Sequence, residues 1–545
     1  MKKYSIGIDF GTLSARAVLA DVENGDILPA VYSFDYPHAV MTALGGKELP
    51  KSYALQHPKD YIDALDFLIP KLVKDNGVAP EQVVGIGIDF TASTIFPLDE
   101  AGVPLCFDQK FIDNPHAYVK LWKHMGADKY APRIEAIAAD FGDMLKITGG
   151  ILSGEFTYPK LYETYVESPE VYAAASRFIH AGDYLATLLT GRYVRSIAYA
   201  TIKDHYDNAS GAGFPPEEFF SRIDEGFVGV LDKLGREVDE VGRSAGSITP
   251  EWAERLGLST KTQIAVPIID AHGAIGAAGI EDGRVVAALG TSAVVTALSS
   301  EKHYVPGIHS HGYGATAPGL MTFEAGIRAM GDLYAYFTKN CLPTEYFDRA
   351  REAGMNIHAY LRSLSENKVV GENGLIALDW WNGNRSVVPN DKLSGMIVGL
   401  TLGTRPEDVY RALIESSVFE LRRVYENYAD NGVKMSSFIA TGGIANKDPM
   451  LMQILADVLN MDIGCLGSSE ATALGSSVWG AVAAGCYPTR EEASAKMKLP
   501  ITKTYSPIPK RVEAYEKIYR RYVVLYDYFA RENDVMEFLF NTKHT

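Results

Sequence analysis

Two short glycine-threonine stretches, GIDFGTLSARAVL and AALGTSAVV, contain residue types that could bind phosphate. Each stretch separates two segments of alternating apolar residues, so an ordinary β-hairpin would explain either one alone. A turn of this kind also presents backbone N–H groups and hydroxyl groups that can surround an anion. Because the pattern occurs twice, about half a chain apart, we favour one triphosphate held between two duplicated turns. The residues concerned are Gly11, Thr12 and Ser14 in the first stretch and Gly290, Thr291 and Ser292 in the second.

Three aspartates, Asp9, Asp89 and Asp270, lie at the ends of apolar segments that read as strands. Ligands of α/β sheets bind outside the carboxyl ends of the strands. Asp9 would hold Mg²⁺ through water, because this ion keeps most of its hydration shell. Small residues follow Asp270 and leave room for a ligand, so we predict that Asp270 is catalytic. The alternative is a carboxylate that caps the next helix, which is the better interpretation for Asp89.

A glycine pair in TGGIANKD, Gly442 and Gly443, is by itself typical of a strand-to-helix turn. In a protein that binds a triphosphate, two residues without side chains would also admit a flat purine against the backbone. The sequence has no Walker motif and no protein-kinase glycine loop. Any nucleotide site is therefore of another type.

Size and charge exclude several classes of protein. The chain has 545 residues, which is too long for one compact core, and its net charge is −16 from 52 basic and 68 acidic residues. This balance argues against a nucleic-acid partner or an anionic membrane surface. Four cysteines lie far apart, and no apolar stretch reaches the ~20 residues of a membrane span, so we expect a cytoplasmic protein.

Strand and helix patterns alternate in both halves of the chain. Residues 83–90 read as a buried strand, and residues 58–77 as a helix that Pro70 should kink or divide. Residues 108–165 are rich in charged and aromatic side chains and look like insertions at the edge of a sheet domain. A final helix is expected near residues 509–529. We place two domains at residues 1–258 and 259–545.

Taken together, these motifs resemble the FGGY carbohydrate kinases of the actin-like ATPase superfamily. The resemblance covers nearly the whole chain, since GIDFGTLSARAVL, GIGIDFTAST, PIIDAHGAIGAAG, AALGTSAVV, GLIALDWWNGNRSVV and TGGIANKDPMLMQILADVL follow in the family's order. It implies an α/β fold with two duplicated actin-like (ribonuclease H-like) domains and a ligand cleft between them. The N-terminal domain would bind the sugar, and the C-terminal domain the nucleotide.

The resemblance also implies roles for particular residues, with ATP and Mg²⁺ as cofactors. Asp270 aligns with the catalytic base, and Asp9 with the magnesium site. The phosphates would contact the two glycine-threonine turns, and the adenosine would lie at Gly442, Gly443 and Lys447. The sugar site would consist of Thr91, Ala92, Trp122, Lys203, Asp270 and Glu324.

Within the family, NPHAYVKLWKH, ALDWWNGNRS and PIIDAHGA are most similar to members that phosphorylate L-ribulose on its terminal hydroxyl. The expected product is L-ribulose 5-phosphate, an intermediate of L-arabinose catabolism. Ile327 and Arg328 depart from the glutamine and serine usual after Glu324, as do the neighbours of Lys203 in ATIKDHYD. A kinase of D-ribulose, xylulose or ribitol therefore stays open as an alternative.

An actin-like chaperone or filament ATPase is a more remote alternative, because the chain has no spare length for a peptide-binding domain. The expected partners are the sugar and ATP, with no nucleic acid and no membrane, and a homodimer is compatible with the sequence.

Overall fold

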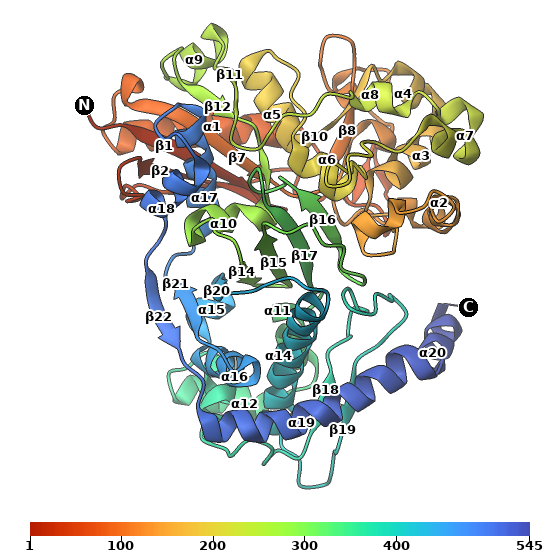
Figure 1. Ribbon diagram of the computed structural model, residues 1–545, viewed down its shortest axis with the longest axis vertical. Helices are drawn as coiled ribbons and strands as arrows, with labels where there is room; N and C mark the ends of the chain where they lie inside the picture. Colours follow the sequence, from red (N-terminus) through yellow and green to blue (C-terminus); the bar gives the residue numbers. More distant parts are fainter. Residues whose placement is uncertain (545) are drawn as a thin grey trace.

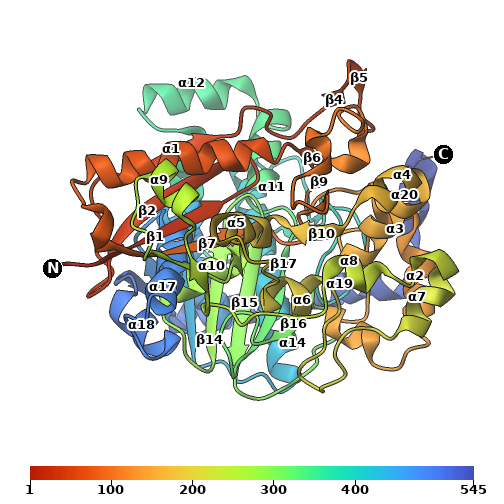
Figure 2. The same ribbon diagram turned by 90° about the horizontal axis from the view of Figure 1, so that it is seen from above.

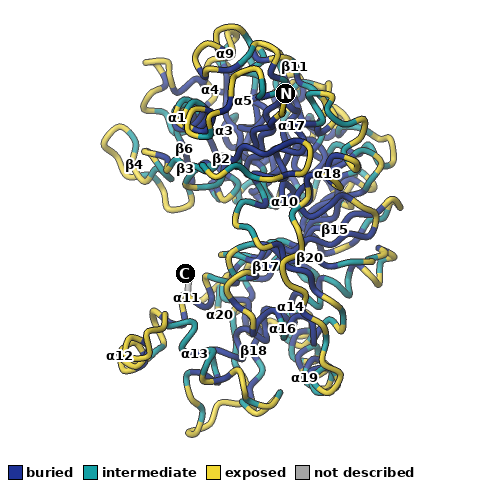
Figure 3. Tube along the Cα trace, turned by 90° about the vertical axis from the view of Figure 1, so that its left-hand side faces the viewer, coloured by how far each residue is buried: buried dark blue, intermediate teal, exposed yellow. Residues whose placement is uncertain are grey.

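The protein consists of two lobes, each built on its own sheet (Figure 1). The computed structural model describes residues 1–544, apart from the side chains of residues 543 and 544. Buried residues gather in separate cores in the upper and lower lobes (Figure 3), one around the first sheet and one around the second.

The first sheet has the strand order β11-β12-β7-β1-β2-β3, with β13 also paired to β7. Strand β2 is antiparallel to both of its neighbours, β1 and β3, whereas β7 runs parallel to β1. The strands are β1 (Tyr4–Phe10), β2 (Ser14–Asp21), β3 (Tyr32–Asp35), β7 (Val83–Phe90), β11 (Ser244–Ser247), β12 (Gln263–Ala265) and β13 (Ile268–Ile269).

The second sheet has the order β16-β17-β15-β14-β20-β21-β22. Here β14, β15 and β17 are antiparallel neighbours, and β20 runs parallel to β14. The strands are β14 (Arg284–Leu289), β15 (Ala293–Ser299), β16 (Ser310–Tyr313), β17 (Met321–Ile327), β20 (Ser437–Thr441), β21 (Ile463–Leu466) and β22 (Ile501–Tyr505).

The two sheets share one topology. In each, an antiparallel hairpin leads to a third strand, and a long helix then crosses to a strand parallel to the first. The crossing helices are α1 (Lys59–Asp75) and α14 (Pro406–Asp430). The expected duplication is therefore present. Helix α1 is continuous, with Pro70 inside it, so of the two expected outcomes, a kink or a division of the helix, the division does not occur.

Helix α17 (Ala471–Ala483), from the C-terminal half, packs directly on β1 and β7 of the first sheet. Seen from above (Figure 2), α1 lies over the first sheet, and α17 and α18 (Arg490–Met497) lie to its other side. Glycines permit this contact: a Cβ at Gly7 would lie 1.7 Å from the carbonyl oxygen of Ala473, and one at Gly87 would lie 1.7 Å from that of Ser476. The alternating glycines of SIGIDF and VGIGIDF thus bring a helix to backbone contact with the strands.

The chain passes from one lobe to the other through α10 (Asp270–Ala278), which also packs on α17. Strands β12 and β13 precede α10 and pair with β7. The boundary that we placed after residue 258 therefore falls inside the first sheet. The alternating apolar residues of this segment do not reveal which sheet it joins.

A side lobe extends the first domain and has its own apolar core. Its sheet, ordered β10-β8-β9-β6, consists of β6 (Leu55–Gln56), β8 (Ile95–Leu98), β9 (Val119–Lys120) and β10 (Arg177–His180). The core reaches Leu234, so the inserted region is longer than the 108–165 expected from composition. Its helices include α2 (Ala131–Ala138), α3 (Thr157–Glu167), α4 (Pro169–Ala174), α7 (Glu217–Ile223) and α8 (Val230–Leu234).

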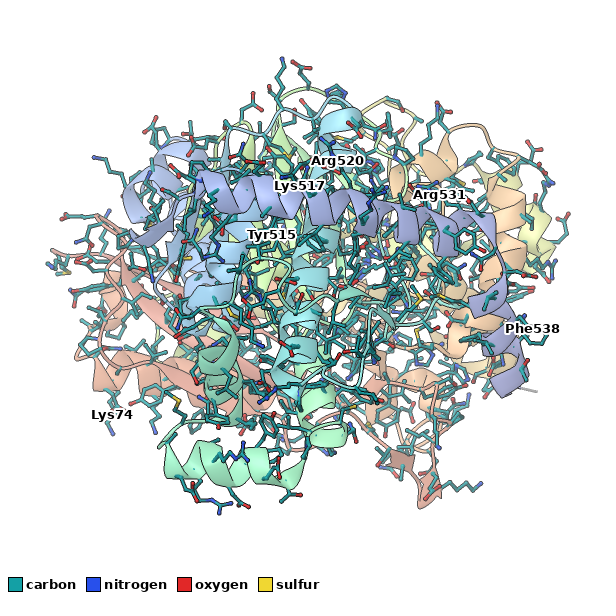
Figure 4. All side chains as sticks on the ribbon, turned by 90° about the horizontal axis from the view of Figure 1, so that it is seen from below. Lys74, Tyr515, Lys517, Arg520, Arg531 and Phe538 are labelled. Atoms are coloured by element: carbon teal, nitrogen blue, oxygen red, sulfur yellow. The ribbon has the colours of Figure 1, made fainter. Side chains whose placement is uncertain are left out.

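Helix α19 (Pro509–Asp527) crosses the lower face of the second lobe and leads to α20 (Val535–His544). In Figure 4, Lys517 and Arg520 project from its outer side, whereas the side chain of Tyr515 is buried. The remaining helices and strands are α5 (Ala181–Thr190), α6 (Ile197–Lys203), α9 (Pro250–Leu256), α11 (Gly331–Asn340), α12 (Thr344–Glu352), α13 (Ile357–Ser365), α15 (Gly443–Lys447), α16 (Pro449–Leu459), β4 (Ala43–Leu44), β5 (Lys47–Glu48), β18 (Ile376–Leu378) and β19 (Met396–Val398).

Candidate functional site

A small cavity of about 150 Å³ lies where the two lobes meet. Both lobes contribute to its wall, and all six residues expected to contact a sugar are there. The lining residues are Thr12, Thr91, Ala92, Trp122, Glu155, Lys203, Ile269, Asp270, Ala271, Ser292, Val294, Glu324 and Arg385. The structure therefore brings together side chains that are widely separated in the sequence.

Asp270 stands at the junction of β13 and α10, as the first residue of the helix. Its Oδ1 accepts a hydrogen bond from the N–H of Ala271 over 2.7 Å. Burial, reinforced by the negative charge of Asp9, raises the pKa of Asp270 to about 7. A carboxylate with this pKa, facing a ligand cavity, is suited to accept a proton near neutral pH.

Asp9 and Asp89 are direct neighbours on the parallel strands β1 and β7. Burial raises the pKa of Asp9, and burial together with the charge of Asp9 raises the pKa of Asp89 well above its usual range. Asp89 Oδ2 accepts a hydrogen bond from Ser476, while Oδ1 is buried with no hydrogen-bond partner in the described part of the chain. Asp89 therefore contacts helix α17. The prediction that it caps the segment that follows it is wrong.

The two glycine-threonine turns close the hairpins β1–β2 and β14–β15, but they differ in length. The N–H of Gly11 donates to the carbonyl of Ser14 over 3.0 Å, whereas that of Gly290 donates to Ser292 over 2.9 Å. The first turn thus has one more residue, and its Leu13 is exposed. Thr12 and Ser292 face the same small cavity, so the duplicated turns lie on opposite sides of one site.

A second cavity of about 680 Å³ adjoins the turn of the second lobe. Its walls combine aromatic residues with polar groups, and Gly443 and Lys447 lie at its edge. The lining residues are Gly290, Thr291, Gly331, Asp332, Tyr334, Asn356, His358, Arg362, Tyr410, Gly443, Ile444, Lys447 and Asp448. Of these, sequence reasoning identified Gly290, Thr291, Gly443 and Lys447, and Ile444 and Asp448 belong to the same TGGIANKD stretch. The other seven lie on α11, on α14, or on α13 and its N-cap, and carry no motif.

The glycine pair performs two different tasks. A Cβ at Gly442, where φ is +96°, would lie 2.6 Å from the carbonyl oxygen of Leu289, so only glycine fits against β14. Gly442 does not line the larger cavity. Gly443 has open space where a Cβ would be, and it lines the cavity. Gly443 is therefore the member of the pair over which a flat ring could lie.

The turn of residues 290–292 borders both cavities. Gly290 and Thr291 line the larger one, and Ser292 lines the smaller one. The N–H groups of Gly331 and Asp332, at the start of α11, donate to the carbonyls of Gly290 and Thr291 over 3.0 and 3.2 Å. A group bound over this turn would lie between the contents of the two cavities.

Three side chains were not found from the sequence: Glu155 and Arg385, which line the smaller cavity, and His309, which contacts the lining residues Lys203 and Glu155. His309 accepts a hydrogen bond at Nε2 from Lys203. Burial, together with Lys203 and Arg385, lowers the pKa of His309 well below its usual range, so the ring is neutral. Burial also lowers the pKa of Lys203, although the negative charges of Glu324 and Glu155 act in the opposite direction and raise it. Arg385 lies in the ALDWWNGNRS stretch, which resembles the family but assigned no role to this arginine.

The departures at Ile327 and Arg328 do not reach the cavity wall. Ile327 is buried in the core of the second lobe, and Arg328 pairs with Asp391 over 2.6 Å. The carboxylate of Glu324 is instead held by the buried His272, which hydrogen-bonds it over 2.9 Å.

Buried Lys160 connects three segments of the wall. Its ammonium group donates to the carbonyls of Ser93 and Leu121 over 2.7 and 2.6 Å, next to Ala92 and Trp122 in sequence. Ser93, in the left-handed region with φ of 51°, in turn donates from its hydroxyl to the carbonyl of Glu155. Lys160 therefore determines how these segments face the cavity.

Known families account for both halves of the chain. The profile of the N-terminal domain of the FGGY family of carbohydrate kinases matches residues 4–275, and that of the C-terminal domain matches residues 285–484. The chain belongs to this family. It is therefore a sugar phosphotransferase of the ATP-dependent type, and the chaperone and filament alternatives no longer apply.

This FGGY kinase is 39% identical to a ribulokinase from Bacillus licheniformis over 542 residues, 98% of each chain. It is 41% identical to a ribulokinase from Mycolicibacterium smegmatis over 541 residues, covering 98% of this chain and 95% of that one. Among solved structures it is similar to a xylulose kinase from Rhodospirillum rubrum, with a TM-score of 0.78, 22% identity, and coverage of 96% and 98%. The predicted fold of two duplicated actin-like domains is confirmed.

None of the helices in the described part of this FGGY kinase combines the length and the apolar character that a bilayer crossing requires.

Proposed function

We propose that the protein transfers the γ-phosphoryl group of ATP to the terminal hydroxyl of L-ribulose, giving L-ribulose 5-phosphate. The relatives with 36–41% identity over nearly the whole chain carry the name ribulokinase. The observation that carries the proposal is the turn of residues 290–292, which borders both cavities. A γ-phosphate over this turn would be in reach of a sugar hydroxyl in the smaller cavity.

Asp270 is the proposed base. Phosphoryl transfer passes through a loose transition state, so the protein contributes mainly positioning and charge stabilisation. A carboxylate oxygen of Asp270 would take the proton of the sugar hydroxyl while the hydroxyl oxygen attacks the γ-phosphorus. The bond between the γ-phosphorus and the oxygen that bridges it to the β-phosphate would break, and ADP would leave. Closure of the two lobes around the cavity would exclude water as a competing nucleophile.

Asp9 is the proposed magnesium ligand, through water. Burial raises the pKa values of Asp9 and Asp89, and the charge of Asp9 adds to the rise at Asp89, whose Oδ1 is buried without a hydrogen-bond partner among the described residues. Both features fit a nearby cation. Within residues 1–544 no cluster of three or more His, Cys, Asp or Glu is arranged to hold a metal. Mg²⁺ needs none, since it is usually held by one or two carboxylates with phosphate and water, and when bound it would neutralise charge on the phosphates.

The nucleotide would occupy the larger cavity. The purine would lie over Gly443, the phosphates would extend to Thr291, and Lys447 would contact the adenosine. On the other side of the cleft, Thr12 and the backbone of Gly11 would contact the γ-phosphate, with Ser14 and Gly442 shaping the turns behind the site. The sugar would contact Thr91, Ala92, Trp122, Lys203 and Glu324.

The test is a substrate panel. With ATP and Mg²⁺, kcat/KM is measured for L-ribulose, D-ribulose, both xyluloses, ribitol and glycerol by coupling ADP formation to NADH oxidation. L-Ribulose should give the highest value. A higher value for another member would contradict L-ribulose as the substrate and would leave the sugar-kinase chemistry standing.

The same proposal includes a cytoplasmic location, where ATP is supplied and where the four free thiols of Cys106, Cys341, Cys465 and Cys486 would stay reduced. A homodimer is a further prediction, which native mass spectrometry would test.

A further inference from the structure

Four charged or titratable side chains form a ring beside the smaller cavity. The contacts run from Arg385 Nη2 to Glu155 Oε2 over 3.8 Å and from there to His309 Nε2 over 3.7 Å. They continue from His309 Nε2 to Glu324 Oε1 over 3.9 Å and return to Arg385 Nη2 over 3.9 Å. Nitrogen and oxygen atoms alternate around this ring, and the same four atoms make all of its contacts.

None of these four contacts is short enough for a direct hydrogen bond. Within the described residues, the carboxylate of Glu155 and the guanidinium of Arg385 have no hydrogen bond at all, although their side chains are only 12% and 14% exposed. Polar groups buried to this extent are normally hydrogen-bonded, and two such groups at this separation can be joined by one molecule that hydrogen-bonds to both. The ring therefore lacks a partner.

The charges of the surroundings indicate what the partner is. The charges of Arg385 and Lys203 outweigh the effect of burial and lower the pKa of Glu155 to about 2. A hydrogen bond from His272 outweighs burial in the same way and lowers the pKa of Glu324. Two carboxylates are thus balanced by Arg385 and Lys203, and His309 is neutral. An uncharged molecule that both donates and accepts hydrogen bonds fits this balance.

We propose that Glu155 and Arg385 are sugar-binding residues that determine specificity, joined by a sugar hydroxyl that donates to Glu155 and accepts from Arg385. This rests on the proposed function and extends its site to a further pair of side chains. The substrate class is an uncharged polyhydroxylated sugar. Because Glu155 belongs to the first lobe and Arg385 to the second, the same hydroxyl would also hold the two lobes together.

The variants Arg385→Gln and Glu155→Gln test the pair. A hydrogen bond to a charged group contributes enough that its loss should raise the sugar KM about 10-fold or more, while the KM for ATP changes less than about twofold. The double variant should lose less than the product of the two single effects, because both residues bind one hydroxyl. Arg385→Lys keeps the cation in case the glutamine variant does not fold, and should retain part of the sugar affinity.

Arg328→Gln is the matched control. Like Arg385, Arg328 is an arginine of the second lobe next to a carboxylate, that of Asp391 at 2.6 Å, and it lies close in sequence to Glu324, but it does not line the cavity. Its sugar KM should stay within about twofold of the wild type, which also tests whether the departure at this position affects sugar choice.

Monodeoxy analogues of the preferred ketopentose identify the hydroxyl. In the wild type each analogue loses kcat/KM, but for one of them Arg385→Gln and Glu155→Gln should cause little further loss, because the bridged hydroxyl is already missing. Equal losses for every analogue, or an unchanged sugar KM in both variants, would mean that the ring holds only water, and would overturn the proposal. If the wild type phosphorylated no sugar of the panel, the proposed function would fail instead, and calorimetric titration of sugar into the variants would still decide the role of the pair.

Discussion

The indole Nε1 of Trp122 donates a hydrogen bond to Oγ1 of Thr12 over 3.1 Å. Trp122 belongs to the inserted side lobe, and Thr12 to the glycine-threonine turn of the first sheet. Gln56 donates to the carbonyl of the same threonine over 2.6 Å. Thr12 therefore connects Trp122, a proposed sugar contact, to the turn that is the proposed phosphate contact of the first lobe.

Thr12→Val and Thr291→Val should have different kinetic effects. Removing the Thr12 hydroxyl breaks the bond with Trp122 and a contact with phosphate, so both the sugar KM and the ATP KM should rise. Thr291 lines only the larger cavity, so its loss should raise mainly the KM for ATP. A hydrogen bond to a charged group is worth about 1.5–3 kcal/mol. Steady-state kinetics with each substrate varied in turn would measure the split, and unchanged values in both variants would return the turns to ordinary hairpins.

Asp270→Asn should abolish sugar phosphorylation while ATP still binds, because an amide cannot accept the hydroxyl proton. In the wild type, the base is active when deprotonated, and the pKa of Asp270 is raised to about 7. The kcat/KM for the sugar should therefore fall about tenfold per pH unit below pH 7 and level off above it. The checks are a pH profile and equilibrium binding of ATP to the variant. A flat profile between about pH 5.5 and about pH 8, a range that includes the pKa of Asp270, together with near-normal turnover of the variant, would exclude this role.

Lys160→Met should raise the sugar KM about tenfold or more and leave the KM for ATP nearly unchanged. Lys160 touches neither cavity, but its bonds hold the segments that carry Ala92, Trp122 and Glu155. Methionine keeps the apolar stem but removes the N–H donors. Each buried carbonyl that loses its hydrogen bond in this way costs about 1–3 kcal/mol of stability.

Lys233→Met provides the control for this positioning role, because Lys233 also donates to a backbone carbonyl, that of Ala175, far from the cavity. Its kinetics should match the wild type. If both lysine variants lost stability alike and kept the sugar KM, Lys160 would be a structural residue only.

Gly7→Ala and Gly87→Ala should destabilise the protein strongly, because each new methyl group would lie 1.7 Å from a carbonyl oxygen of α17. Overpacking of this kind typically costs about 1–3 kcal/mol and more where backbone cannot move. Gly229→Ala, where no atom lies within 4 Å of the new Cβ, should change stability by less than about 0.5 kcal/mol. Urea unfolding midpoints would compare the three. Midpoints equal to that of Gly229→Ala would show that α17 does not contact the sheet this closely.

The sequence by itself determined the local chemistry of the site. The glycine-threonine turns, the strand-end position of Asp270 and the glycine pair are each encoded within a few neighbouring residues, because turns and strand ends depend on local backbone conformation. Their duplication predicted two similar sheets, and their order predicted the family. Even here the one-residue difference between the turns was missed, since hairpin register becomes visible only when the strands pair.

Tertiary structure decided which residues share the site. Glu155 and Arg385 have no common motif, and they meet only because the two lobes face each other across one cavity. Asp89 was interpreted as a cap because its partner, Ser476, lies on a helix that returns from the C-terminal half. Because Ile327 and Arg328 follow Glu324 closely in the sequence, they were expected to affect which sugar is bound. Neither residue lines the cavity. Side chains that are adjacent in a strand point to opposite faces, and contacts across the lobes depend on how whole sheets pack, which no short stretch of sequence encodes.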